Sequence, residues 1–227
     1  MTSGADRVPP ALPRGIRTPL AIAGLLGIIV AVSLGLVFAG QATGTRLDDH
    51  LAVTLQLPYV LPRVYTVSLI VQGLADPIPA MILMVLLAAI CWQSGQRRLA
   101  LLAIIGPAAA DTTVIVMKHL VGRTIHNGNL SYPSTHAAQS AAFAMVTALL
   151  VTALLKIEAG AAAAVVLGAA AAGALVMGWA LVGGGVHYAT DTLAGFCVAI
   201  AVVPVLAWCT DLAGDRILLA RRVEPAA

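Results

Sequence analysis

Long apolar stretches separated by short polar segments set the organisation of the chain. Six of these stretches have a length close to the ~20 residues that a helix needs to cross a bilayer. They cover residues 19–40, 66–92, 99–121, 136–155, 161–182 and 189–210. The second stretch is interrupted near residues 76–79, where Asp76 and Pro77 form a helix-start signal. The pattern predicts an all-α, polytopic membrane bundle of six transmembrane helices.

The segments outside these stretches predict a simple domain organisation. Residues 1–18 are rich in proline and arginine and show no apolar periodicity, so we expect a disordered tail. The first apolar run is longer than the ~7–15 residues of a signal-peptide core, which favours an uncleaved anchor. A second tail is expected at 211–227. Residues 19–210 then form a single six-span domain.

Two further segments allow local predictions. Residues 41–65 mix charges with apolar positions, which favours an external loop with a short amphipathic piece along the membrane interface. Asp48 and Asp49 are interpreted as the N-terminal cap of that piece. Residues 161–182 are nearly all Ala, Gly, Val and Leu, and small residues let helices approach closely. We therefore expect this span in the packed interior of the bundle.

Composition supports a membrane protein and gives it an orientation. The 227 residues are 60% hydrophobic and 10% charged, against about a quarter charged in soluble domains. The net charge of +3 does not indicate nucleic-acid binding, and the expected partner is the lipid bilayer. Nine of the thirteen Lys and Arg residues lie in the tails and in the loops 93–98 and 156–160. The positive-inside rule then predicts cytoplasmic termini in a multi-pass plasma-membrane protein.

Two polar segments on the opposite, extracytoplasmic side hold most of the candidate chemistry. They are KHLVGRTIHNGNLSYPSTH at 118–136 and GGGVHYATD at 183–191. Four of the five histidines lie in them together with Lys118, Arg123 and Asp191. Ionisable residues at the ends of membrane spans are costly and are usually kept for function.

The first segment predicts an anion site. Ser134 directly precedes an apolar helix and is a good N-cap, and free backbone N–H groups and the helix dipole at such a position attract anions. Lys118 and Arg123 add positive charge, and the planar fork of arginine fits two phosphate oxygens. The alternative for both basic residues is an interfacial role at span ends.

The second segment supplies a carboxylate and an imidazole on one face. His187 and Asp191 are four residues apart, as neighbours on a helix are. The carboxylate can hold one imidazole nitrogen protonated and leave the other as base or nucleophile. With His136 from the first segment, two histidines around an anion site indicate phosphoryl transfer. Alternatively, both histidines are polar helix ends, and Asp191 is a cap or a bundle hydrogen-bond partner.

The order Lys…Arg, Pro-Ser-x-His, His-x-x-x-Asp in a six-span chain resembles the type 2 phosphatidic acid phosphatase superfamily of membrane lipid phosphatases. The resemblance covers roughly residues 66–205, and HYATDTLAGF extends it beyond the catalytic pair. It implies that His187 is the nucleophile that forms a phosphohistidine, that Asp191 orients it, and that His136 is the general acid. It also implies that Lys118 and Ser134 hold phosphate oxygens.

The chain departs from the family pattern at the phosphate-clamping positions. Ile125 and His126 stand where the first block has Arg-Pro, and Leu181 stands where the third block has its arginine. Thr135 replaces the glycine of the second block and is included among the expected phosphate-binding residues. Arg123 lies two positions early, and could replace the missing clamp.

The glycine run before His187 is a second candidate replacement. Glycines adopt positive φ readily, so Gly184 and Gly185 could turn successive backbone N–H groups toward one anion. The alternative is a tight turn between two spans. Asp111 is interpreted as a structural bundle residue or as a charge relay. His126, Asn127 and Asn129 are either head-group contacts or ordinary polar loop residues.

These observations predict an enzyme. We expect a phosphatase that hydrolyses a lipid phosphate or pyrophosphate at the extracytoplasmic face, with a phosphatidate-like or polyprenyl substrate. Because Lys, Arg and a helix N-terminus supply positive charge, no metal or other cofactor is expected. The alternative is a catalytically weak or inactive relative that binds lipid phosphate head groups. A transporter is disfavoured, because the ionisable residues cluster at one face and not at mid-membrane.

Overall fold

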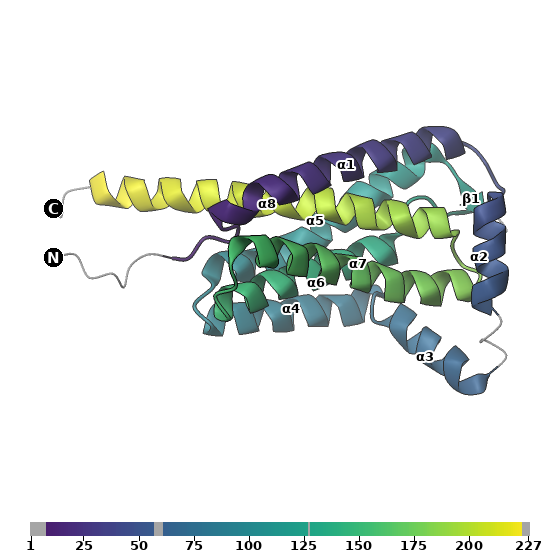
Figure 1. Cartoon of the computed structure of the whole chain (residues 1–227), viewed down its shortest axis with the longest axis horizontal. Helices are drawn as coiled ribbons and strands as arrows, with labels where there is room; N and C mark the ends of the chain where they lie inside the picture. Colours follow the sequence, from purple (N-terminus) through teal and green to yellow (C-terminus); the bar gives the residue numbers. More distant parts are fainter. Residues whose placement is uncertain (1–7, 57–60, 127, 224–227) are drawn as a thin grey trace.

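The computed structural model describes residues 8–56, 61–126 and 128–223, and these are organised as eight helices and one short hairpin. Five of the helices are long and apolar enough to cross a membrane and run side by side along the long axis of the molecule (Figure 1). They are α1 (Arg14–Phe38), α5 (Arg97–Val121), α6 (Thr135–Leu154), α7 (Ala159–Gly183) and α8 (Ala189–Val223). The predicted polytopic α-helical bundle is confirmed.

The remaining predicted span is a bent pair of helices. α3 (Pro62–Gly73) and α4 (Pro77–Gln93) meet at an angle of 66°. The bend lies where Asp76 is the N-cap of α4 and Pro77 occupies its first turn. A proline lacks the backbone N–H that would continue the preceding helix, so the chain starts a new one. Counted as one crossing, the pair brings the apolar spans to six.

The most buried of the apolar spans is α6, and not the small-residue span α7 that we expected in the interior. The small residues of α7 instead mark where it touches α6. A Cβ atom added at Gly173 would lie 2.8 Å from the carbonyl oxygen of Ser140. Small residues thus set the distance between two neighbouring helices without placing either one at the centre of the bundle.

The two ends of the bundle are built differently (Figure 1). Both termini emerge at one end, the terminal end. At the other end, the α2 end, α2 (Arg46–Gln56) lies across the tips of the long helices beside the antiparallel hairpin of β1 (Thr124–Ile125) and β2 (Asn129–Leu130). The predicted short helix within 41–65 is therefore present, although residues 57–60 lie outside the described residues.

The start of α2 refines the predicted cap. The Asp48 carboxylate accepts a hydrogen bond from the backbone N–H of Thr45 at 3.0 Å, and the Thr45 hydroxyl accepts one from the N–H of Asp48 at 3.1 Å. This reciprocal pair is a capping box, in which Thr45 is the cap and Asp48 its partner three residues later.

The ordered N-terminal part begins earlier than expected, and much of the C-terminal tail is helical. Residues 1–7 and 224–227 lie outside the described residues, but α1 begins at Arg14 and α8 continues to Val223. Ala11 and Leu12 are buried, and their backbone N–H groups donate to the Asp211 carboxylate at 2.6 and 3.0 Å. A buried carboxylate needs such donors, so it orders the chain segment that supplies them.

Candidate active site

His187 and Asp191 form a pair at the α2 end, as their spacing predicted. Asp191 lies in the first turn of α8 and is buried, and its Oδ2 atom is 3.4 Å from Nδ1 of His187. The same Oδ2 accepts a hydrogen bond from the backbone N–H of Tyr188 at 3.1 Å. Because Nδ1 faces the carboxylate, Nε2 is the nitrogen of His187 that is left for a reacting group.

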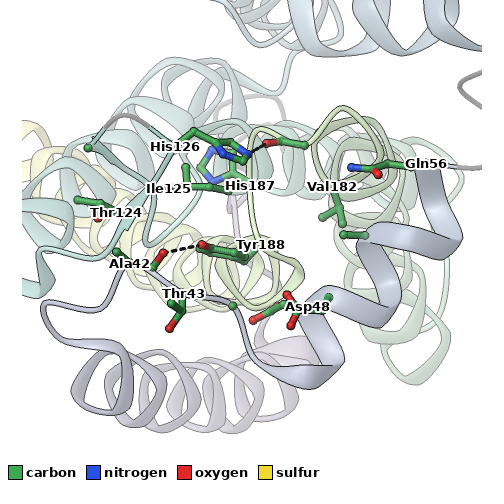
Figure 2. A pocket seen from close by; sticks show the side chains of 15 residues that line it. Ala42, Thr43, Asp48, Gln56, Thr124, Ile125, His126, Val182, His187 and Tyr188 are labelled. Atoms are coloured by element: carbon green, nitrogen blue, oxygen red, sulfur yellow. Dashed lines mark hydrogen bonds between the residues drawn. The ribbon is translucent and has the colours of Figure 1, made fainter.

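His187 lines a cavity of about 680 Å³ at the α2 end. Figure 2 shows the cavity between α2, the hairpin and the α7–α8 turn, with His126, Gln56, Asp48 and Tyr188 also among its lining residues. His126 reaches the α7–α8 turn through Nε2, which lies 2.9 Å from the Gly185 carbonyl oxygen. The cavity therefore brings both polar segments together at one place.

Apolar side chains occupy the two family clamp positions. Ile125, at the first position, is buried and lines the cavity. Leu181, at the second, is buried in an apolar cluster with Ala75 and Met177. Neither side chain can bind phosphate, so the site must obtain its positive charge from other residues.

His136 lies in the first turn of α6 at the same end of the molecule. Its Nε2 atom is 3.5 Å from Oδ1 of Asp76, at the bend between α3 and α4. His136, His187 and Lys118 are close enough for their charges to interact. His136 is not among the residues that line the 680 Å³ cavity, and its contact with Asp76 places it beside the α3–α4 bend.

Ser134 is the N-cap of α6, as expected: its hydroxyl accepts a hydrogen bond from the N–H of Ala137 at 3.3 Å. Its own backbone N–H donates to the Asp191 carbonyl oxygen at 3.0 Å, which ties the start of α6 to the start of α8. The following Thr135 begins α6. Lys118, near the end of α5, donates to the Leu130 carbonyl oxygen at 2.9 Å. The helix N-terminus and the ammonium group thus lie near the histidines.

Arg123 is fully buried between two carboxylates. Nη1 donates to Oδ1 of Asp191 at 2.7 Å, and Nη2 donates to Oδ2 of Asp48 at 3.2 Å. Nη1 also donates to the Thr190 hydroxyl at 2.7 Å, and Nη2 to the Thr43 carbonyl oxygen at 3.3 Å. Both terminal nitrogens of the guanidinium group therefore already have anionic partners.

Two aromatic rings cover the faces of the same guanidinium group. The centroid of the Phe38 ring lies 3.9 Å from its central carbon, and that of the Tyr188 ring lies 4.1 Å away. Such stacking favours a desolvated arginine. Arg123 is not among the residues that line the cavity, and its contact with phosphate stays a prediction that would require it to exchange a carboxylate partner.

The glycine run ends α7 as a tight turn. The N–H of Gly184 donates to the Ala180 carbonyl oxygen at 3.1 Å, and the N–H of Gly185 donates to that of Val182 at 3.0 Å. Gly185 has the positive φ of +71° that the turn requires, whereas Gly184 has helical geometry. The proposed array of free amides is not formed, because these N–H groups close the helix end. A phosphate contact from the two glycines stays a prediction that would require this end to open.

Asp48 is a partner of the candidate site that the sequence indicated only as a cap. Its buried carboxylate also accepts hydrogen bonds from the N–H of Thr190 at 2.9 Å and from the Thr190 hydroxyl at 3.0 Å. Burial alone would raise the pKa of Asp48, but hydrogen bonds from Thr45 and Thr190 outweigh it and leave the pKa below its ordinary value. The capping signal was visible in the sequence, but the contact with α8 was not.

For the remaining polar candidates, Asp111, Asn127 and Asn129, both interpretations given in the sequence analysis stay open. Oδ1 of Asp111 is buried and has no hydrogen-bond partner among the described residues. Asn129 is exposed in the hairpin, and Asn127 lies outside the described residues.

Comparison with known proteins places these features in a family. Residues 79–215 match the model of the PAP2 superfamily, and they include both polar segments. A crystal structure described as the first transmembrane PAP2-type phosphatidylglycerolphosphate phosphatase from Bacillus subtilis is similar to this chain, with a TM-score of 0.62 at 20% identity. The alignment covers 87% of this chain and 96% of that one. No curated protein sequence matches the chain. The fold, the motif order and the family match together show that the chain belongs to the PAP2 superfamily.

Proposed function

We propose that this protein is a lipid phosphatase that hydrolyses a lipid phosphate or pyrophosphate through a phosphohistidine at His187. Family membership supports lipid phosphatase activity in general. The observation that carries the finer proposal is the buried Asp191 carboxylate behind Nδ1 of His187, at a cavity of about 680 Å³. This arrangement directs Nε2 toward a bound phosphate and stabilises the positive charge that the imidazole gains on phosphorylation.

The proposed reaction has two displacements at phosphorus. Nε2 of His187 attacks phosphorus, the bond to the leaving oxygen breaks, and His136 donates a proton to that oxygen. His136 then takes a proton from water as the water attacks the phosphohistidine. The second displacement releases inorganic phosphate and restores both histidines. The 3.5 Å contact between Asp76 and His136 would hold the acid imidazole in place between these steps.

Phosphate binding in this proposal depends on Lys118 and the N-terminus of α6. The first turn of α6 after the Ser134 cap carries the positive end of the helix dipole, and Thr135 adds a hydroxyl there. With Ile125 and Leu181 at the two clamp positions, this is a weaker anion site than one with two arginines. A substrate anchored by its apolar tail in the bilayer needs less affinity from the head group alone.

We place the reaction on the extracytoplasmic side. The termini and most of the basic residues share the terminal end, which the positive-inside rule assigns to the cytoplasm. Cysteines introduced at Ser94 and at Asp49, in a variant with Cys91, Cys197 and Cys209 replaced by alanine, test this orientation. An impermeant maleimide added to intact cells should label position 49 and leave position 94 unlabelled. The reverse result would reject the proposed side.

The direct test of activity is phosphate release from a panel of lipid phosphates in detergent micelles, covering phosphatidate, phosphatidylglycerolphosphate and polyprenyl mono- and diphosphates. Wild-type protein should release phosphate from at least one of them. His187→Ala should abolish release, because it removes the atom that bonds to phosphorus. Release that persists in His187→Ala at the wild-type rate would reject the mechanism.

The role of His136 predicts a dependence on the leaving group. His136→Ala should slow hydrolysis of alkyl phosphates by roughly 10²- to 10⁴-fold and affect aryl phosphates much less, since a stable leaving group needs little protonation. Rates for a series of soluble phosphate esters measure this difference. Equal losses for good and poor leaving groups would show that His136 is not the acid.

A second candidate is a relative that binds lipid phosphate head groups without hydrolysing them. The specific observation in its favour is that the nearby Arg123 already has two carboxylate partners while both clamp positions are apolar. Lipid phosphate binding without phosphate release from any member of the panel would favour this function over the phosphatase.

A further inference from the structure

Arg123, in the first polar segment, is buried against the cavity-lining residues Asp48 and Tyr188 and is bonded to the residue that orients the proposed nucleophile. We infer that Asp48 and Arg123 form a positioning relay, in which α2 holds Asp191 in the orientation that fixes the tautomer of His187. This inference rests on the proposed function and gives Arg123 a task other than phosphate binding. The relay consists of four residues in contact order: Asp48, Arg123, Asp191 and His187.

The two oxygens of Asp191 have separate partners. Oδ1 accepts from Arg123 at 2.7 Å, which fixes the plane of the carboxylate. Oδ2 is thereby directed at Nδ1 of His187, and the N–H of Tyr188 steadies it at 3.1 Å. A carboxylate that pivoted about its own bond would lose the orientation that keeps the imidazole proton on Nδ1.

Arg123 can fix Asp191 because its ring contacts and the bonds of its two terminal nitrogens hold it in place, although its buried Nε has no hydrogen-bond partner among the described residues. The rings of Phe38 and Tyr188 cover its faces, and Asp48 holds the second terminal nitrogen at 3.2 Å. With a carboxylate on each terminal nitrogen, Arg123 is neutralised within the protein and does not attract the substrate phosphate strongly. Arg123 therefore acts on Asp191 and not on the substrate.

Asp48 brings α2 into the relay. Its carboxylate binds Arg123 on one side and both the N–H and the hydroxyl of Thr190 on the other, so it contacts the residue that precedes Asp191 in the chain. The capping box with Thr45 fixes Asp48 to the start of α2. The position of α2 at the mouth of the cavity is thus linked to the orientation of Asp191 by direct contacts.

Asp48→Asn tests the relay, because it keeps the shape and removes the charge that holds Arg123. We expect kcat to fall roughly 10- to 100-fold, the loss typical of outer partners that orient a histidine, with KM changed less than about two-fold. Asp49→Asn is the matched control: it removes a neighbouring, exposed charge of the same helix, and should affect KM at most. An unchanged kcat in Asp48→Asn would overturn the inference.

A readout independent of activity separates the relay from a merely structural contact. In protein labelled with ¹⁵N-histidine and without substrate, His187 should carry its proton on Nδ1, and Asp48→Asn should shift it toward the Nε2–H form. The His187→Gln variant assigns the resonance among the five histidines. A structural role alone would lower the yield of folded protein but leave the tautomer and the kcat of the folded fraction unchanged, which would overturn the inference.

Arg123→Lys serves as a second variant if Asp48→Asn does not fold. It keeps the positive charge but lacks the fork that binds both carboxylates, so the same loss of kcat and the same tautomer shift are expected. Wild-type values of both would reject the relay. If the wild-type protein releases no phosphate from any lipid, the proposed function fails, and the tautomer measurement decides the relay by itself.

Discussion

The two ends of the bundle carry arginine–aspartate clusters in which the buried carboxylates have different surroundings. At the terminal end, Asp211 is held by two arginines, Arg17 at 3.0 Å and Arg98 at 3.2 Å. At the α2 end, one arginine, Arg123, is shared by two carboxylates. Arg98 also binds the exposed Asp215 at 2.6 Å. The terminal end thus places two cations on one buried carboxylate, whereas the α2 end places two buried carboxylates on one cation.

The number of donors around each buried carboxylate determines whether one of its oxygens remains available to another group. Oδ1 of Asp211 is bound by Ala11 and Arg98, and Oδ2 is bound by Leu12 and Arg17, so four donors saturate the carboxylate. Because both of its oxygens are occupied, the Asp211 carboxylate serves to hold these segments together. Asp191, in contrast, gives only Oδ1 to its arginine, while Oδ2 faces His187 and accepts one backbone N–H, that of Tyr188. A shared cation thus leaves a carboxylate oxygen available for a functional group.

The largest contrast is expected between matched Asp→Asn variants at the two ends. Asp191→Asn should lower kcat by roughly 10²- to 10⁴-fold, because it disturbs the tautomer of His187 and its positively charged intermediate without deleting the nucleophile. Asp211→Asn should lower thermal stability and leave the turnover of the folded fraction within about two-fold of wild type. Phosphate release per folded molecule measures both. Equal losses in the two variants would erase the distinction between the ends.

For stability, we expect the larger effects at the terminal end. Arg98→Met removes a mostly buried partner of Asp211 and Asp215, and we expect it to cost about 3–5 kcal/mol, as for other broken buried pairs. Arg17→Met should cost less, because the Arg17 side chain is 31% exposed against 8% for Arg98. Unfolding in mixed micelles measures these differences. A greater loss of unfolding free energy from Arg17→Met than from Arg98→Met would contradict the assignment of Arg98 as the more important partner of Asp211.

The smallest expected effect is a pH dependence from Asp48. Its pKa in the folded protein lies below the ordinary value of 3.8, so its ionised form stabilises the fold. That contribution is complete above the ordinary pKa and is lost as the pH falls through the folded value. The stability difference between wild type and Asp48→Asn should stay constant from about pH 7 to 5 and shrink below about pH 4. Asp49→Asn is the matched control, and a difference that grows in acid would reject this ionised state.

Hydropathy was sufficient to predict the spans and the side-by-side fold, because every helix that crosses a membrane must be long and apolar. It was less informative about burial. The small residues of 161–182 predicted an interior span, yet α6 is the most buried, since close approach between two helices does not determine which lies at the centre. The N-terminal tail was overestimated for a related reason: Asp211 orders Ala11 and Leu12, which are about two hundred positions away.

The His187–Asp191 contact was predictable because the two residues are neighbours along one helix start. The partners of the site were not, because they come from distant segments. Asp48 gave a local capping signal that concealed its contact with Arg123, and Asp76 gave a helix-start signal that concealed its contact with His136. A short charged side chain at a helix start can serve both purposes, and only the packing of helices decides which distant group it meets.

Trapping of the covalent intermediate tests the central claim most directly. Wild-type protein mixed with a ³²P-labelled lipid phosphate and quenched in alkali within milliseconds should carry an acid-labile, alkali-stable label on His187, at up to one phosphate per chain. The label should decay as inorganic phosphate appears, and it should be absent from His187→Ala. Phosphate release without labelled protein, or a label that persists in His187→Ala, would contradict the account.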